Sequence, residues 1–294
     1  MQYKKLLMLA LITLSVASCK QEKSVEASAQ RATENSSKEA LASEPGTAVD
    51  PGSSGAAITD AKAVLFEIYK EKIEEISGSQ LSDGRYVSYW HGQTFSHVGK
   101  NYFVAFTEAT PASEIEYPAQ EDKVTIAQAT YEFIDKQWQL KKVQHDIGQF
   151  GSLNKAPMAD PEAKAVSFSG AKEKFILAVP TFQTAIAGTR LSAQAIFSFS
   201  QADFSWKYLG QFDTGSDNGA GCAREPESTS PIKCAKSTAA LHFSNDGNSD
   251  LPSIEVHMSG TAIDENGKVI NLTEKDRVRY RFDSKSSSYK KATQ

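Results

Sequence analysis

The chain has 294 residues, with 32 Lys and Arg against 36 Asp and Glu, for a formal net charge of −4. No basic face stands out in the sequence. Because binding to a nucleic-acid backbone needs clustered Lys and Arg, we expect no nucleic-acid partner. After the first 18 residues, no segment of the sequence is long and apolar enough to span a membrane.

The N-terminus has the layout of a secretory signal. Lys4 and Lys5 precede an apolar run over residues 6–17, followed by the small residue Ser18. The run is shorter than the roughly 20 residues of a membrane-spanning helix. The sequence Val16-Ala17-Ser18-Cys19 resembles the lipobox of bacterial lipoproteins.

This resemblance implies that residues 1–18 are a lipoprotein signal peptide and that Cys19 is acylated and becomes the mature N-terminus. The lipid anchor would then bind the chain to the membrane, because each CH₂ of an acyl chain buried in the bilayer contributes about 0.8 kcal/mol to the free energy of membrane binding. The residue after the cysteine is Lys20, and in this the chain resembles lipoproteins of the outer membrane. The resemblance implies that the chain faces the periplasm or the cell surface. The alternative is an ordinary secretory signal with a chance cysteine.

Residues 19–59 are predicted to be a lipidated N-terminus followed by a disordered tether. The segment is rich in Lys, Glu, Ser, Ala, Thr, Gly and Pro, and the first aromatic after the signal is Phe66. Such a composition buries too little apolar surface to offset its conformational entropy. A flexible chain of this length has a span of roughly 35 Å, which would let a domain stand off the membrane.

Residues 60–77 are predicted to form an amphipathic helix at the start of a single domain over 60–294. Thr59 or Asp60 can cap its first turn, and Gly78 stands where a helix commonly stops. Its stripe of apolar residues recurs at helical spacing: Ala61, Val64, Leu65, Ile68, Ile73 and Ile76. We expect the stripe to pack on the domain; the alternative is a free helix that binds a partner.

From Tyr86 onward the sequence is typical of strands and repeats itself. Residues 102–107 resemble residues 175–180, and residues 127–133 resemble residues 193–199. The segment 127–133 is followed by Trp138, and the segment 193–199 is followed by Trp206. A third copy keeps only a hairpin at 280–290. The repeat predicts a mainly β fold of repeated antiparallel β-meanders, propeller-like or a two-sheet sandwich, with one N-terminal helix. The alternative is similarity from generic hairpin composition.

Cys222 and Cys234 are the two cysteines left after signal removal. An even pair in an exported chain predicts a disulfide. A bridge closing such a short loop would stabilise the fold by roughly 3 kcal/mol. The alternative is two unpaired thiols.

Residues 245–252 form a loop rich in Asn and Asp before an apolar strand. The loop resembles those of calcium-binding β-propeller repeats of the FG-GAP type, which implies Asp246, Asn248 and Asp250 as calcium ligands. The leading Asp of that family is absent, and a polar turn explains the composition better. We therefore assign no metal ligands and no required cofactor, with calcium as the alternative.

Two short segments of the sequence are similar to catalytic motifs. Ser169 with Lys172, and Ser216-Asp217-Asn218, resemble two motifs of the serine β-lactamases and penicillin-binding proteins. The third motif lacks its glycine at residues 236–238, so no catalytic residue is assigned. The histidines stand at positions 91, 97, 145, 242 and 257. Trp138 and Trp206 are expected in sheet cores, and Trp90 is a candidate ligand contact.

These observations favour a non-catalytic binding or scaffold module of the cell envelope, with an unknown envelope protein or glycan as partner. Two alternatives stay open. One is a hydrolase whose site is assembled from residues distant in sequence. The other is an inhibitor of a cell-wall enzyme, for which the loop between Cys222 and Cys234 is the candidate contact.

Overall fold

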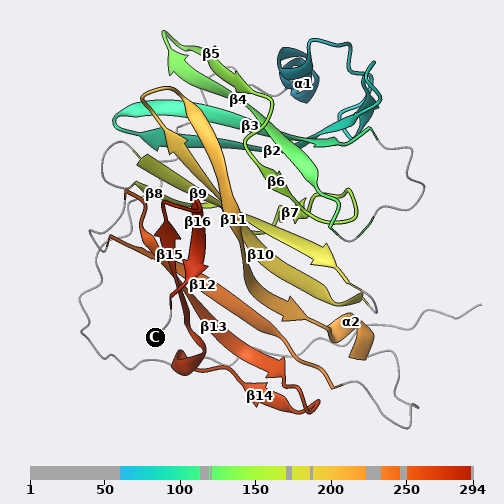
Figure 1. Cartoon of the computed structure of the whole chain (residues 1–294), viewed down its shortest axis with the longest axis vertical. Coiled ribbons are helices and arrows are strands. Elements are labelled where there is room, and N and C mark those ends of the chain that lie inside the picture. Colours follow the sequence, from blue (N-terminus) through green and yellow to red (C-terminus); the bar gives the residue numbers. More distant parts are fainter. Residues whose placement is uncertain are drawn as a thin grey trace, which may run out of the picture. The chain divides into compact units, whose positions relative to one another are not determined.

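The computed structural model describes residues 60–112, 119, 121–169, 174–185, 188–222, 233–245 and 250–292. The predicted signal peptide, Cys19 and the tether lie outside these residues. The described part is mainly antiparallel β, arranged in repeated meanders after one N-terminal helix, as predicted (Figure 1). Three sheets are present among the described residues, one more than a sandwich of two sheets contains.

Helix α1 (Ala61–Tyr69) is shorter than the predicted helix over 60–77. The Oδ1 atom of Asp60 caps it by accepting from the Lys62 amide at 3.0 Å. The helix ends because Lys70 takes the left-handed conformation, with φ of 59°, and its N–H bonds to the Phe66 carbonyl at 2.7 Å. The amides of Glu74 and Glu75 then donate to the Ser79 hydroxyl instead of continuing the helix.

The first sheet follows the helix and has the strand order β1-β2-β3-β4-β5, with β6 paired to β4. Its strands are β1 (Ser79–Gln80), β2 (Tyr86–His97), β3 (Lys100–Thr110), β4 (Val124–Ile134), β5 (Gln137–Gln144) and β6 (Gln149–Phe150).

The second sheet has the order β11-β10-β9-β7, with β8 paired to β9. Its strands are β7 (Met158–Ala159), β8 (Val166–Ser169), β9 (Lys174–Thr184), β10 (Arg190–Ser200) and β11 (Ser205–Asp217). The segments that repeat in the sequence occupy equivalent strands, β3 with β9 and β4 with β10. At the hairpin that follows, Phe133 faces Trp138 in the first sheet and Phe199 faces Trp206 in the second.

The third sheet has the order β12-β13-β15-β16, with β14 paired to β13. The elements are α2 (Gly219–Cys222), which precedes the sheet, β12 (Ser237–Ser244), β13 (Ser253–Ile263), β14 (Val269–Asn271), the 3₁₀ turn η2 (Glu274–Asp276), β15 (Val278–Asp283) and β16 (Ser288–Lys291). Phe282 faces Tyr289 at its last hairpin, in the place of the Phe–Trp pairs of the other sheets.

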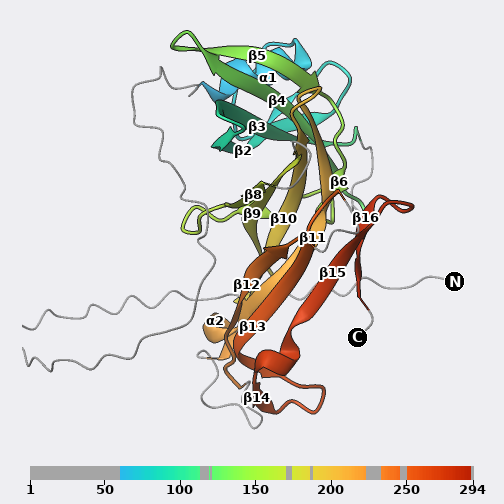
Figure 2. The same cartoon turned by 90° about the vertical axis from the view of Figure 1, so that its left-hand side faces the viewer.

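The second sheet is apolar on both faces, which places it between the other two (Figure 2). On β9, Phe175, Leu177 and Val179 pack into a core shared with the first sheet. The intervening Ile176 and Ala178 pack into a core shared with the third sheet. Alternation along one strand therefore serves two cores, because successive side chains point to opposite faces.

Helix α1 covers the other face of the first sheet. Val64 and Ile68 of the helix cluster with Phe103 and Ala105 of β3. The intervening residues of β3, such as Val104, belong to the core shared with the second sheet. The apolar stripe of the helix therefore packs on the domain, as expected from its spacing.

Candidate functional site

Strand β15 and the residue before it alternate arginine with apolar side chains. Arg277, Arg279 and Arg281 are exposed, whereas Val278 and Tyr280 between them are partly buried. Tyr280 packs into the core shared with the second sheet. Because side chains alternate along an extended segment, the three guanidinium groups lie on the face of the third sheet that is turned away from that core.

Glu255 of β13 faces Arg279 across the sheet. Its Oε1 atom accepts from the Nε of Arg279 at 2.5 Å and also from Nη2, while Oε2 bonds to the Nε2 of His257 at 3.0 Å. The hydrogen bonds from His257 and then from Arg279 hold the pKa of Glu255 below its usual range. The carboxylate is therefore ionised at neutral pH and compensates part of the charge of Arg279.

These side chains line a groove of about 620 Å³ on the third sheet. Four of the lining residues are cationic, one is acidic and none is aromatic. The lining consists of Glu255, Arg277, Val278, Arg279, Arg281, Lys291 and Ala292. The groove therefore presents mostly positive charge.

The cations around the groove differ in how far they are compensated. Lys290 is paired with Asp283 at 2.5 Å, and this contact helps to lower the pKa of Asp283 to about 2. Arg277 and Lys291 are exposed, and their side chains form no ion pair within the part of the chain that the structure describes. A guanidinium fork matches a carboxylate or phosphate with two parallel hydrogen bonds, so the groove can hold oxyanions.

A second, smaller groove of about 280 Å³ lies beside β2 and β7 and includes Trp90, the candidate ligand contact. The indole N–H of Trp90 donates to the Pro157 carbonyl at 2.7 Å, and its ring meets Phe150 edge to face at 4.9 Å. Glu108 accepts from Ser88 at 2.6 Å and from the Ala156 amide at 3.2 Å. The side chains of Trp90, Glu108 and Ser88 are therefore engaged in contacts within the fold.

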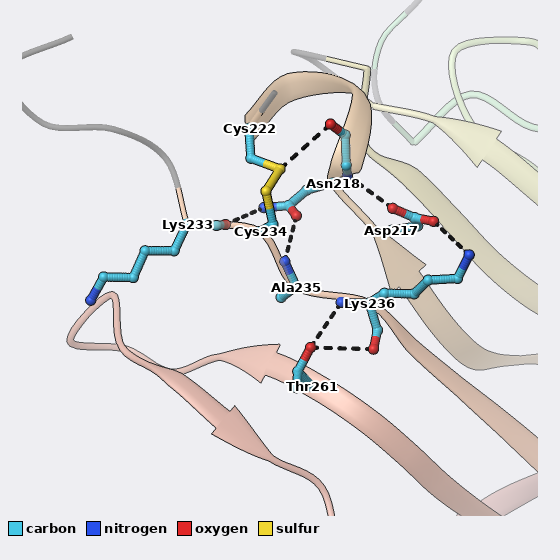
Figure 3. The surroundings of a disulfide bond; sticks show 9 residues. Asp217, Asn218, Cys222, Lys233, Cys234, Ala235, Lys236 and Thr261 are labelled. Atoms are coloured by element: carbon cyan, nitrogen blue, oxygen red, sulfur yellow. Dashed lines mark hydrogen bonds and ion pairs between the residues drawn. A yellow bond between two sulfur atoms is a disulfide. The ribbon is translucent and has the colours of Figure 1, made fainter. Parts of the chain in front are cut away.

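Cys222 and Cys234 form a disulfide, as predicted, with their Cα atoms 5.3 Å apart (Figure 3). Asn218 supports the bridge: its side chain donates to the Lys233 carbonyl at 2.9 Å and accepts from the Ala235 amide at 2.7 Å. The bridge and Asn218 together hold residues 233–235, just before β12, beside α2.

Three of the residues that resemble β-lactamase motifs make contacts within the fold. Asp217 pairs with Lys236 at 3.0 Å, and Asn218 supports the disulfide loop (Figure 3). The amide of Ser216 donates to the Ser237 hydroxyl at 3.1 Å. Ser169 is exposed at the end of β8, and Lys172 lies outside the described residues.

The calcium candidates are only partly within the described structure. Asp250 is exposed just before β13, whereas Asp246 and Asn248 lie outside the described residues. Among the residues that are described, no three His, Cys, Asp or Glu side chains are placed to hold a metal ion.

The five histidines occupy separate environments, apart from one pair. The rings of His242 and His257 lie against each other on the third sheet, with centroids 4.2 Å apart and planes tilted by 39°. His97 packs on Phe175, and burial lowers the pKa of His91 to about 4. Within the described residues, His257 hydrogen-bonds to Glu255 and to no hydroxyl group.

Trp138 and Trp206 pack in the cores between sheets and helix, as expected. Trp206 is buried between the first and second sheets, and Trp138 packs against Phe103 and Phe133 on the helix-covered face of the first sheet.

Searches of protein-family models, curated proteins and solved structures found no match to this chain. None of the helices in the described ranges is both long and apolar enough to cross a membrane.

The arginine row was missed in the sequence, although a signal for it exists. Residues 280–282 alternate aromatic and charged side chains, which places the two aromatics on one face. The same alternation, followed from Arg277 to Phe282, places three arginines on the opposite face. The signal is a pattern of cationic residues at every second position, which differs from a contiguous run of cations.

Proposed function

We propose that this chain is an acylated lipoprotein of the outer membrane that acts as a non-catalytic binding or scaffold module of the cell envelope. The lipobox-like sequence ending at Cys19 supports the anchor. The observation that carries the binding role is the solvent-open groove of the third sheet, in which four cations face a single carboxylate.

The hydrolase alternative needs a nucleophile or a water activated by an acid–base group. The best arrangement for it is the Glu255–His257 pair, at 3.0 Å. In the described residues no hydroxyl or thiol bonds to the His257 ring, so the pair has no side-chain nucleophile beside it. This supports the binding role over catalysis through a covalent intermediate.

The anchor is tested with Cys19→Ser. The wild-type precursor should be cleaved and should incorporate labelled palmitate, whereas the variant should do neither. Normal palmitate uptake by the variant would remove the lipoprotein part of the proposal.

The choice between binding and catalysis is tested by complementation of a deletion strain under envelope stress. His257→Gln removes the imidazole from the carboxylate pair but keeps a neutral polar side chain. A binding module should tolerate it, provided that circular dichroism shows a folded protein. Loss of complementation by folded, fully expressed His257→Gln, together with full complementation by a variant lacking Arg277 and Arg281, would favour the hydrolase instead.

A further inference from the structure

The arginine row of the third sheet has a regular spacing. Alternate residues of an extended strand are about 7 Å apart, so Arg277, Arg279 and Arg281 place guanidinium groups at that interval along one line. Lys291 of the neighbouring strand also lines the groove, although it stands opposite Tyr280 and not opposite an arginine. Such an arrangement matches a ligand with several negative charges in a row better than a ligand with one.

We propose that the groove lined by Arg277, Arg279, Arg281 and Lys291 binds a linear anionic polysaccharide through its carboxylate or phosphate groups. Arginine forks bind both of these oxyanions with paired hydrogen bonds. The choice of a polysaccharide rests on the envelope location proposed above, whereas the requirement for repeated negative charge rests on the groove itself.

Glu255 gives the groove a built-in competitor. Its carboxylate already occupies Arg279, while His257 holds it in place from the other side. The row therefore has a compensated centre, with Arg277 at one end free of ion pairs to described residues. A single carboxylate gains little by displacing Glu255, whereas a chain of charges also engages Arg277 beside it.

Single-stranded nucleic acid is the other linear polyanion to consider. Proteins that bind it combine basic grooves with aromatic side chains on which bases stack. Of the described residues that line this groove, none is aromatic. The groove therefore offers charge without a stacking surface, which favours the polysaccharide.

The test measures binding to the full chain, purified in detergent, by isothermal titration. The probes are polygalacturonate for carboxylates, inorganic polyphosphate for phosphates, dextran as a neutral polymer and a single-stranded DNA oligonucleotide. One or both of the first two should bind, with affinity falling as salt rises, and dextran should not bind. The tighter of the two identifies the oxyanion.

The decisive variant is Arg277→Gln/Arg281→Gln, which should weaken polyanion binding by about tenfold or more. Its matched control is Lys207→Gln/Lys285→Gln, which removes the same charge at exposed positions outside the groove and should leave affinity unchanged. Melting temperatures show whether both variants are folded, and Arg277→Gln alone serves if the double variant is not.

Three results would overturn the proposal: no binding of either polyanion, equal affinity of the groove variant and the wild type, or DNA binding as tight as polygalacturonate and equally sensitive to the variant. These results are independent of the anchor, because detergent replaces the membrane. Failure of Cys19 to take up palmitate would remove the proposed location and leave binding by the groove intact.

Discussion

The indole Nε1 of Trp206 on β11 donates to the hydroxyl of Thr130 on β4 at 2.9 Å, so the two repeated meanders are joined by a buried hydrogen bond. The Thr130 hydroxyl in turn donates a hydrogen bond to the Oε1 atom of Gln128 at 2.6 Å. Gln144 of β5 accepts from the Trp206 amide at 2.7 Å and receives a hydrogen bond from Gln128 at 2.8 Å. The polar groups at this sheet–sheet contact are therefore satisfied by one another.

Replacing Thr130 with Val should destabilise the fold by about 1–3 kcal/mol, because the nearly isosteric side chain leaves the buried Trp206 N–H without an acceptor. Denaturant unfolding followed by tryptophan fluorescence measures this. Thr125→Val in the same strand is the control, since the Thr125 hydroxyl makes no hydrogen bond with the described residues. Equal stabilities of the two variants would show that the Trp206–Thr130 bond contributes nothing net.

The double variant Cys222→Ser/Cys234→Ser should lose roughly 3 kcal/mol of stability, because the oxidised chain closes a short loop in the unfolded state. Reduction of the wild type by dithiothreitol should give the same loss, and the reductant should have no effect on the variant. Labelling of both cysteines by a thiol reagent in native exported protein would contradict the bridge.

His91 should make stability fall in mild acid. Burial lowers the pKa of the folded side chain to about 4, whereas an unfolded histidine titrates near 6.5. As pH falls from about 6.5 toward 4, the unfolded chain gains a proton that the folded chain does not bind. Stability is therefore complete above pH 6.5 and declines below it, by up to about 3 kcal/mol from this residue.

The measurement is the free energy of unfolding between pH 7.5 and 4.5 for wild type and His91→Gln. The variant should lose less stability in acid than the wild type, because its side chain does not titrate. His145→Gln is the control, since His145 is exposed and should leave the wild-type profile unchanged. Identical pH profiles for His91→Gln and wild type would refute the role of His91.

Local sequence was enough for several features of the fold. Alternating aromatics such as Phe197 and Phe199 identified strands. The tryptophan that follows each copy of the repeat, Trp138 or Trp206, identified equivalent hairpins, in which each faces a phenylalanine. The pair Cys222 and Cys234 was also identified, because exported chains rarely keep two thiols apart.

Long-range contacts explain what local sequence did not reveal. The helix pattern continues through Ile73 and Ile76, but the Ser79 hydroxyl captures the amides that the helix would need. The groove depends on the register between β13 and β15, which places Glu255 opposite Arg279. Residues 24 positions apart carry no local signal of that pairing, so only the alternation of the arginines was available in advance.

The two-sided burial of the middle sheet has a consequence for how the molecule comes apart. Strands β9 and β10 contribute alternate side chains to two cores, so loss of either neighbouring sheet uncovers apolar residues of the same strands. A chain ending at residue 217 would leave Ile176, Ala178 and Ile196 facing water. Such a fragment would self-associate instead of folding alone, and the third sheet therefore protects the second sheet from aggregation.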